Sequence, residues 1–321
     1  MRCLKVVEPG LMSTVQDLGR PGAAWLGVPP SGAADPVALR VANGAVGNAP
    51  GEAAVEVTLL GAAFEVLSDV AFAVGGTECV ARIESASGGA RELRPFVRVR
   101  AAQGDIVRIG PAKQGCRAYL AVAGGIDVAP VLGSRSTLVS AGFGGFEGRA
   151  LRCGDVLACR AAAGTAPGID AAAAERLLSE LRSRQVLRIV PGPQHAAFDH
   201  PGQFCDEPFR ISSRSDRTGI RLEGRCIASP FAGRMSSQPM MHGAIQVPPG
   251  GEPIVLMCDH PTTGGYPVVG CVIAADLPVL GQRRPGDRVR FEWVTIAEAR
   301  RLAGELEQRV RQCVPGSRDV Q

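Results

Sequence analysis

Glycine and proline interrupt this chain so often that long uninterrupted helices are not expected. The sequence holds 41 Gly and 24 Pro among 321 residues. Glycine readily adopts left-handed turn conformations, whereas proline ends helices and interrupts strand ladders. Glycine and proline at this frequency favour many short strands joined by tight turns. We therefore expect a mainly β fold with a few short helices.

Three Gly-Asp pairs mark strand entrances by their turn chemistry. Gly104-Asp105, Gly154-Asp155 and Gly286-Asp287 are each followed by an apolar stretch. Glycine and aspartate are both favoured in turns, so each pair predicts a turn that leads into a strand. Their occurrence in both halves of the chain hints at two distantly similar β domains.

The chain length predicts two domains. Single cores rarely grow beyond roughly 250 residues, and this chain has 321. The segment AAAGTAPG, from Ala161 to Gly168, has the composition of a linker. We expect an N-terminal β-barrel domain over 1–165, a helical linker over 166–184, and a C-terminal barrel with a terminal helix over 185–321.

Three helices are expected from their end signals and apolar stripes. Asp35 and Pro36 suit the N-cap and first position of a helix that Gly47-Asn48 would end. A second helix begins near Asp170 and carries three leucines on one stripe, and the capping pair Thr295 and Glu298 opens a third.

Charge and hydropathy exclude several function classes. The net charge of +4 is dispersed along the chain, and 2 Trp, 2 Tyr and 10 Phe provide no aromatic platform interleaved with basic residues. Nucleic-acid binding is therefore not expected. No apolar run reaches membrane-spanning length, and MRCLKVVEPG offers no signal-peptide core. We expect a cytoplasmic protein that does not bind membranes.

The cysteines and histidines do not predict a metal site. The 10 Cys include no C-x-x-C pair, and most are expected to be small buried side chains rather than disulfides. His195, Asp199 and His200 form a loop cluster that fits a hydrogen-bonded surface better than a metal centre. The sequence also contains no G-x-x-x-x-G-K-[ST] loop, so this chain is not expected to bind ATP through a P-loop.

Polar motifs punctuated by Gly and Pro recur along both halves. The N-terminal half contains TVQDLGRPG (Thr14 to Gly22), SGAADP (Ser31 to Pro36), GNAPGEAAVEVT (Gly47 to Thr58) and AYLAVAGGIDVAPVLGSRST (Ala118 to Thr137). The C-terminal half contains SDRTGIRLEG (Ser215 to Gly224), GAIQVPPGGEPIVL (Gly243 to Leu256), TTGGYP (Thr262 to Pro267), ADLP (Ala275 to Pro278) and RPGDRVRF (Arg284 to Phe291).

In order and spacing these motifs resemble the family of 5-oxoprolinase C subunits, also described as biotin-dependent carboxyltransferase or allophanate hydrolase subunit 2. The resemblance runs from about residue 4 to residue 293. It implies two cyclophilin-like β-barrel domains and a role in ATP-dependent conversion of 5-oxo-L-proline to L-glutamate. It also implies partners that resemble the B and A subunits of 5-oxoprolinase, with ATP and Mg²⁺ bound by the complex.

The TTGGYP segment is the first candidate for substrate binding. Thr262 and Thr263 supply hydroxyls, Tyr266 a phenol, and Gly264 and Gly265 let a ligand approach the backbone closely. Such a surface suits carboxylate or phosphoryl oxygens. A tight turn that closes one end of a barrel is the structural alternative, and the family resemblance favours a site.

Three further residues are candidates on chemical grounds. Arg214 and Arg217 could grip a carboxylate with their guanidinium forks, or form local ion pairs with Asp216. Gln246 is an amide in an apolar strand and needs a partner if it is buried. The motif that holds Gln16, Asp17 and Arg20 raises the same question, and a turn held by side-chain bonds to backbone is its structural alternative.

Some positions depart from the family pattern. Relatives commonly carry Glu at Gln238, Arg at His260 and Gln at Pro261. Cys258, Asp259 and His260 could bring a thiol and an imidazole to one strand face, but the triplet is not a family motif. No catalytic residue is assigned from the sequence.

Two alternative functions remain open. The chain could be the carboxyltransferase component of a biotin-dependent urea or amide carboxylase, accepting biotin from another protein because Lys5 and Lys113, its only lysines, lack a Met-Lys-Met context. It could also be a non-catalytic binder of a partner that resembles a kinase inhibitor.

Overall fold

The chain divides into two compact units in a computed structural model that describes residues 1–162, 169–231 and 235–314. Unit 1 comprises Met1–Arg20, Asp35–Arg182 and Gln308–Gln321, and unit 2 comprises Pro21–Ala34 and Ser183–Glu307. The predicted helical linker over 166–184 is divided after Arg182 between the two units, and the division differs from the predicted domains in two further places. The segment 21–34 groups with unit 2, and the end of the C-terminal helix groups with unit 1.

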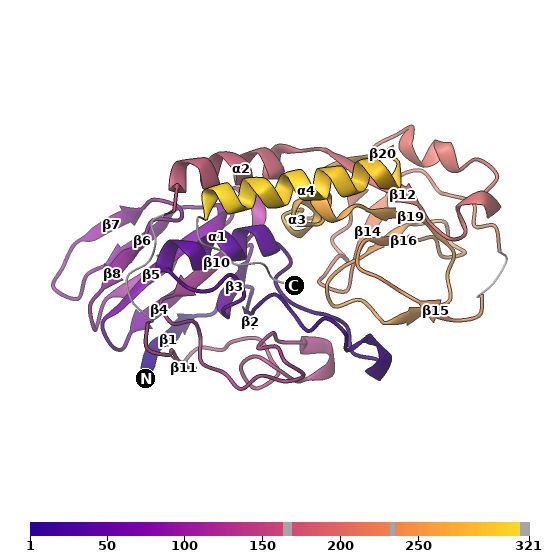
Figure 1. Cartoon of the computed structure of the whole chain (residues 1–321). Coiled ribbons are helices and arrows are strands. Elements are labelled where there is room, and N and C mark those ends of the chain that lie inside the picture. Colours follow the sequence, from indigo (N-terminus) through magenta and orange to yellow (C-terminus); the bar gives the residue numbers. More distant parts are fainter. Residues whose placement is uncertain (163–168, 232–234, 315–321) are drawn as a thin grey trace. The chain divides into compact units, whose positions relative to one another are not determined.

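Unit 1 contains two sheets (Figure 1). The six-stranded sheet has the order β11-β1-β4-β9-β6-β7. Its strands are β1 (Arg2–Glu8), β4 (Ala62–Val66), β6 (Ala81–Glu84), β7 (Ala90–Leu93), β9 (Ile106–Ile109) and β11 (Val156–Ala158). The five-stranded sheet has the order β2-β3-β10-β5-β8, with β2 (Met12–Gln16), β3 (Ala54–Thr58), β5 (Val70–Glu78), β8 (Val99–Ala101) and β10 (Gln114–Val122).

The two sheets of unit 1 share one apolar core, and a helix covers part of the five-stranded sheet. Inward side chains such as Leu4, Phe64, Phe72 and Leu120 are almost completely buried in this core. Helix α1 (Pro36–Val46) packs on β5 and β10. Fully burying each large apolar side chain contributes about 1.5–3 kcal/mol, so this core is the main source of stability in unit 1.

The helix ends follow the sequence prediction. The carboxylate of Asp35 accepts a hydrogen bond from the Ala38 N–H at 3.0 Å, and Gly47 ends α1 with a φ of 81°. Asp170 likewise accepts from the Ala173 N–H at 2.8 Å, at the start of α2 (Ala171–Ser183). Helix α4 (Ile296–Cys313) begins after Thr295, whose hydroxyl accepts from the Glu298 N–H at 3.1 Å.

Unit 2 is built on a closed barrel with the strand order β12-β19-β16-β17-β14-β13-β20 (Figure 1). The parallel pairing of β12 with β20 closes it, and its other pairs are antiparallel. The strands are β12 (Val186–Pro191), β13 (Phe209–Ile211), β14 (Gly219–Glu223), β16 (Ala244–Gln246), β17 (Ile254–Leu256), β19 (Val268–Val272) and β20 (Arg288–Trp293). The unit also holds the ribbon of β15 (Gln238–Pro239) and β18 (Thr263–Gly264), and the short helix α3 (Leu277–Gly281).

The three Gly-Asp pairs form the same turn in both units. Gly104, Gly154 and Gly286 have φ values of 89°, 89° and 91°, in the left-handed region that a type II turn requires at its third position. In each turn the Asp carboxylate accepts a hydrogen bond from the N–H three residues earlier, at 2.9, 2.7 and 3.1 Å. The strands β9, β11 and β20 follow, as the sequence predicts.

The expected fold class is confirmed: the chain is mainly β with few helices. The strands of unit 2 close into a barrel, whereas those of unit 1 form two separate hydrogen-bonded sheets. In the described part of the chain, no helix combines the length and apolar character that crossing a membrane requires.

Candidate functional site

The candidate site in unit 2 begins at a short ribbon that contains part of the TTGGYP motif. Gln238 pairs with Gly264 and Pro239 with Thr263, which joins β15 to β18. The N–H of Met240 also donates to the Thr262 carbonyl at 2.8 Å. These bonds fix the backbone of the motif against the segment that leads into β16.

Gln246 and Gly264 are packed against each other. Gln246 lies buried on β16 and directs its amide Nε2 toward the Met240 sulfur at 3.3 Å. A Cβ added at Gly264 would lie only 2.5 Å from this Nε2 atom. A side chain at position 264 would therefore displace the Gln246 amide, and the structure brings together two residues that the sequence analysis proposed separately.

A mostly apolar cavity lies beside this ribbon. It has a volume of about 400 Å³, and its walls include Pro191, Met240, Met241 and Val268. Gln238 contributes a polar edge, where its side-chain amide exchanges hydrogen bonds with that of Gln194 at 3.1 and 3.2 Å. An apolar cavity with a few polar groups is the usual form of a small-molecule site.

A buried ion pair lies at one end of the barrel. Arg217 Nε and Nη2 donate to the two carboxylate oxygens of Asp259 at 2.8 and 3.1 Å. The Ser31 hydroxyl donates to the same carboxylate at 2.7 Å, and Arg217 donates to the Gly32 carbonyl at 2.7 Å. The pair thereby ties the segment 21–34 to the barrel, which explains why this segment groups with unit 2.

His242 lies at the same end of the barrel. Arg217 precedes β14, Asp259 follows β17, and His242 precedes β16, and the antiparallel pairing of these strands places all three at one end. The Nε2 atom of His242 is buried and forms no hydrogen bond with any described residue. Burial, with the nearby His260 and Arg217, lowers the pKa of His242 from 6.5 to about 4. The ring is therefore neutral near pH 7 and can offer a donor or an acceptor to a ligand.

The side chains of Cys258, Asp259 and His260 each contact a different group. The Cys258 thiol is directed toward the Arg217 carbonyl at 3.8 Å, and Asp259 belongs to the ion pair. His260 Nδ1 lies 2.9 Å from the Pro261 carbonyl, and burial lowers the pKa of its imidazole. These positions favour a structural role for the thiol.

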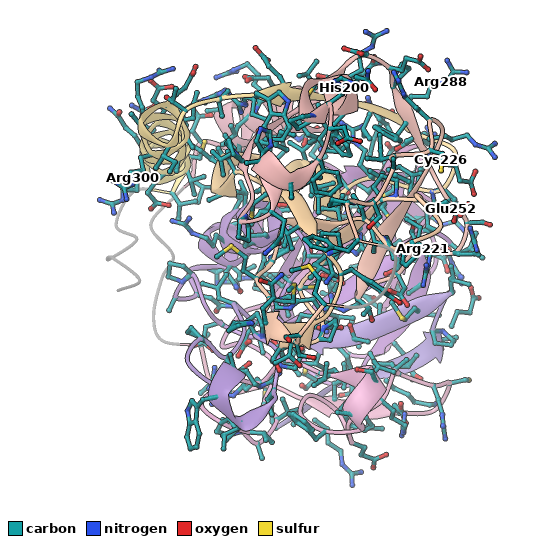
Figure 2. All side chains as sticks on the ribbon, turned by 90° about the vertical axis from the view of Figure 1, so that its right-hand side faces the viewer. His200, Arg221, Cys226, Glu252, Arg288 and Arg300 are labelled. Atoms are coloured by element: carbon teal, nitrogen blue, oxygen red, sulfur yellow. The ribbon has the colours of Figure 1, made fainter. Side chains whose placement is uncertain are left out.

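The remaining predicted residues lie nearer the surface. Arg214 is exposed and pairs with Glu252 at 3.0 Å, and Figure 2 shows Glu252 and the exposed Arg221 on the outer side of the barrel. Thr263 is exposed, whereas Thr262, Gly265 and Tyr266 are partly buried. Asp216 accepts hydrogen bonds from the Thr218 and Gly219 N–H groups, which form a local turn.

The Asp17 carboxylate of unit 1 joins its own turn to the distant segment of Ser134 to Ser136. The Asp17 carboxylate accepts from the Ser134 and Ser136 hydroxyls at 2.6 and 2.5 Å, and from the Gly19 and Arg135 N–H groups at 2.7 and 2.5 Å. Gln16 and Arg20 donate to the carbonyls of Thr137 and Val131 at 3.1 and 3.4 Å. Side-chain bonds to backbone are present, as in the structural alternative, but most partners of these residues lie 111 to 121 residues away in the sequence.

The loop histidines have separate surroundings. His195 packs edge-on against Trp293, with ring centres 4.6 Å apart. His200 and Asp199 line a different cavity of unit 2. Within residues 1–162, 169–231 and 235–314, no three His, Cys, Asp or Glu side chains gather closely enough to hold a metal ion.

The sequence analysis missed His242, Met240 and Met241. All three belong to the segment that runs from the ribbon into β16. The available signal was a histidine, one of 4 in the chain, directly before a motif that was already a candidate. Its burial could not be inferred, because it depends on barrel strands distant in sequence.

Comparison with known proteins identifies the family of this chain. Residues 26–293 match the family described as carboxyltransferase domain, subdomain A and B. The chain is 38% identical over 298 residues to the C subunit of 5-oxoprolinase from Escherichia coli, covering 92% of this chain and 93% of that protein. It is 35% identical over 312 residues to the C subunit of 5-oxoprolinase from Haemophilus influenzae, covering 95% of each.

A solved structure shows the same fold. The K. lactis urea amidolyase is similar with a TM-score of 0.88 and 29% identity, over 99% of this chain but only 20% of that one. The family match spans the segment 21–34 only in part, and it includes the whole barrel of unit 2. The chain belongs to the carboxyltransferase subdomain A and B family, in the branch that includes the C subunits of 5-oxoprolinase.

Proposed function

We propose that this chain is the C subunit of an ATP-dependent 5-oxoprolinase, which opens the lactam of 5-oxo-L-proline to give L-glutamate. The observation that carries the proposal is the match to the Escherichia coli protein, of which this chain covers 93%. By contrast, the chain covers only 17% of the urea amidolyase of Saccharomyces cerevisiae. The proposed complex also contains B-like and A-like proteins, which resemble the other two subunits of 5-oxoprolinase.

The proposed reaction explains why several proteins cooperate. Amide resonance disfavours attack of water on a lactam, and phosphorylation of the amide oxygen would make its carbon a better electrophile. ATP would supply that phosphoryl group. This sequence has no P-loop, so we assign ATP and Mg²⁺ binding to the complex and the handling of the small amide substrate to this chain.

The proposed substrate site combines the ribbon, the buried amide and the apolar cavity of unit 2. Gln246 supplies amide hydrogen-bonding groups, and the Thr262 and Thr263 hydroxyls with the Gly264-Gly265 backbone surround the approach to it. In this proposal Tyr266 closes the site with its phenol. Preorganised donors of this kind stabilise developing negative charge.

His242 and Arg217 have different roles in the proposal. The buried Nε2 atom of His242 lacks a partner among the described residues, so it is available to the substrate or to the attacking water. Arg217 acts as a positioning residue, because its Nε and Nη2 atoms bind Asp259 and Gly32. Arg214 is exposed and paired with Glu252, so we leave it outside the site.

Reconstitution of the complex tests the proposal. This chain would be co-expressed with its candidate A-like and B-like partners, and ATP-dependent formation of glutamate from 5-oxoproline would be measured with each protein omitted in turn. We expect activity only when all three are present. A stable assembly of all three without activity would contradict the proposal.

A second test concerns the site. Tyr266→Ala should abolish activity of the reconstituted complex, whereas Arg221→Ala, on the exposed outer side of the barrel, should leave it unchanged. Full activity of Tyr266→Ala would remove this residue from the site while leaving the oxoprolinase function in place.

Carboxyl transfer from biotin is the second candidate, because the structural similarity to K. lactis urea amidolyase is high. In that case the chain would accept carboxybiotin from a separate carrier protein and pass the carboxyl group to urea or a related amide. Stimulation of carboxylation by this chain in the presence of a biotin carrier would favour it. Binding to a B-like partner with neither activity would instead favour the non-catalytic binder.

A further inference from the structure

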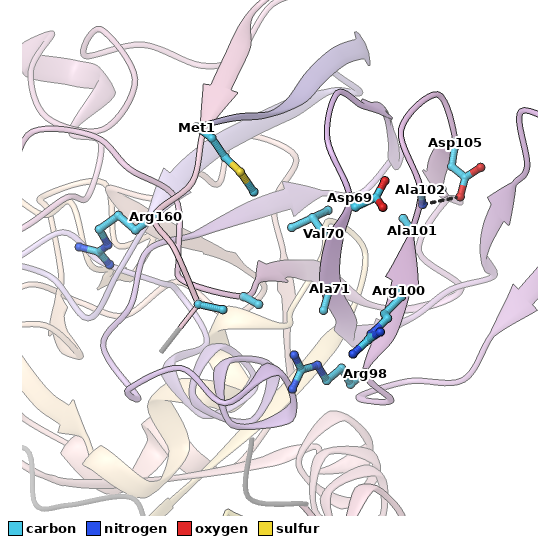
Figure 3. Close-up of a pocket in the computed structure, with 12 residues that line it drawn as sticks. Met1, Asp69, Val70, Ala71, Arg98, Arg100, Ala101, Ala102, Asp105 and Arg160 are labelled. Atoms are coloured by element: carbon cyan, nitrogen blue, oxygen red, sulfur yellow. Dashed lines mark hydrogen bonds between the residues drawn. The ribbon is translucent and has the colours of Figure 1, made fainter. Parts of the chain in front are cut away.

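A second cavity lies in unit 1, at the edge of the five-stranded sheet. It has a volume of about 480 Å³ and includes the edge strand β8 (Figure 3). Val99 and Ala101 of this strand belong to the core, so the alternating Arg98 and Arg100 lie on the opposite face. Both arginines line the cavity.

Small side chains form the floor of this cavity. Ala71 is the cross-strand partner of Arg100, and the Ala123 N–H donates to the Ala71 carbonyl at 2.8 Å. With Ala162, these residues leave room for a ligand close to the backbone. A volume in the range of about 300–1,000 Å³ is typical of small-molecule sites.

The two carboxylates that line the cavity accept hydrogen bonds from backbone N–H groups. Asp69 accepts from the Gln103 N–H at 3.0 Å, and Asp105 accepts from the Ala102 N–H at 2.9 Å and the Ala86 N–H at 3.1 Å. These bonds hold the two carboxylates in turns. Asp105 is also buried in one of the three Gly-Asp turns described above.

The basic groups differ in whether they have partners. Arg160 donates to Glu52 and to the Gly124 carbonyl. By contrast, Arg98 and Arg100 form no hydrogen bond or ion pair with any residue in the described part of the chain, and Figure 3 shows both directed into the same space. Two neighbouring guanidinium groups repel each other, so an anion held between them is favourable, although the charges of Asp69 and Asp105 in the same cavity oppose part of this attraction.

We propose that this cavity binds a small dianionic ligand whose charge, on one phosphate group or on two carboxylates, is held by Arg98 and Arg100. The planar guanidinium fork matches both carboxylate and phosphate oxygens. The group could therefore come from a phosphate ester or from a dicarboxylate. The proposal is independent of the oxoprolinase assignment, because it concerns binding to this chain in unit 1.

Calorimetric titration of the full chain at low salt tests the proposal with two probes, pyrophosphate and glutarate. We expect saturable binding of at least one probe, and the preferred probe identifies the source of the oxyanion. Arg98→Gln and Arg100→Gln should each raise the Kd about tenfold. Ala71→Val should also weaken binding, because it narrows the cavity without changing its charge.

The matched control is Arg300→Gln, which removes the same charge from an exposed position on α4 (Figure 2). It should leave the Kd unchanged. Absence of saturable binding of both probes would overturn the proposal, as would unaltered binding to the Arg98→Gln/Arg100→Gln double variant. If neither probe binds and the double variant fails to assemble with a B-like protein, these arginines contact a protein partner instead.

Discussion

The buried carboxylates of Asp17 and Asp259 show how differently the two units use polar groups. Asp17, in unit 1, accepts four hydrogen bonds from neutral donors in its own neighbourhood. Asp259, in unit 2, neutralises the guanidinium of Arg217, and near this pair the buried Nε2 of His242 has no partner among the described residues. The first arrangement joins two distant segments through neutral donors alone, whereas the second neutralises a buried cation beside a neutral imidazole.

The largest effect on stability is expected from breaking the ion pair of unit 2. Arg217→Met leaves the Asp259 carboxylate buried without its cation, which should lower the free energy of unfolding by about 3–5 kcal/mol. Urea denaturation followed by circular dichroism measures this change. The double variant Arg217→Met/Asp259→Leu should recover part of the loss, and the remainder reflects the Ser31 hydroxyl that then lacks its acceptor. Equal stability of the single and double variants would contradict this assignment.

A smaller loss is expected in unit 1. Asp17→Ala removes the acceptor of two buried serine hydroxyls and two N–H groups, and should lower the free energy of unfolding by about 2–3 kcal/mol. The same denaturation experiment measures it. Activity of the assembled complex should persist at temperatures where the variant stays folded. Loss of activity in a folded Asp17→Ala complex would show that Asp17 is needed for activity as well as for stability.

A pH dependence of stability is expected from His242. Its pKa is lowered from 6.5 to about 4 in the folded chain. Between pH 4 and pH 6.5 the unfolded chain binds a proton at His242 that the folded chain does not. The free energy of unfolding is therefore highest above pH 6.5 and decreases as the pH is lowered through this range. The slope from this group is at most about 1.4 kcal/mol per pH unit. His242→Phe should remove that slope, as measured by denaturation at several pH values.

His242→Phe also tests whether the imidazole is structurally needed. Replacing a buried polar group that lacks a partner by an apolar ring should leave stability at pH 7 unchanged or raise it by up to about 1 kcal/mol. His242→Asn removes the titration but keeps a buried polar group, so it should be the less stable of the two variants. A clear loss of stability in His242→Phe would show that the ring has a structural partner.

A smaller loss of stability than those at Arg217 and Asp17 is expected at the ribbon. Gly264→Ala would bring a methyl group within 2.5 Å of Gln246 Nε2, so the amide must move. We expect activity of the complex to fall several-fold, with a stability loss of about 1 kcal/mol. Gly250→Ala is the matched control, because no atom lies within 4 Å of its added Cβ. Equal activity of the two variants would show that the position of Gln246 is unimportant.

Local chemistry explains which features of the fold could be predicted. The Asp35 cap and the Gly-Asp turns depend on residues within a few positions of each other, and the structure contains them where the sequence placed them. The seven-stranded closure depends on the parallel pairing of β12 with β20, roughly a hundred residues later, which no local pattern indicates. The segment 21–34 groups with unit 2 through contacts to Arg217 and Asp259, which are also distant in the sequence.

The candidate site was predictable in part for the same reason. Gln246 and TTGGYP were found because an amide in an apolar strand and a paired glycine are visible in the sequence. The pairing of Arg217 with Asp259, which lies 42 residues away, required the folded barrel. His242 escaped notice because a histidine is recognised as a candidate only when its burial and its partners are known.

The activity of a complex that contains His242→Phe tests the central claim most directly. The variant would be assembled with its A-like and B-like partners, its assembly checked by size-exclusion chromatography, and glutamate formation from 5-oxoproline measured against the wild-type complex. We predict normal assembly and stability with activity reduced about a hundredfold, the scale at which a positioned acid, base or hydrogen-bonding group contributes. Wild-type activity in the assembled variant would contradict a role for His242 in the substrate site.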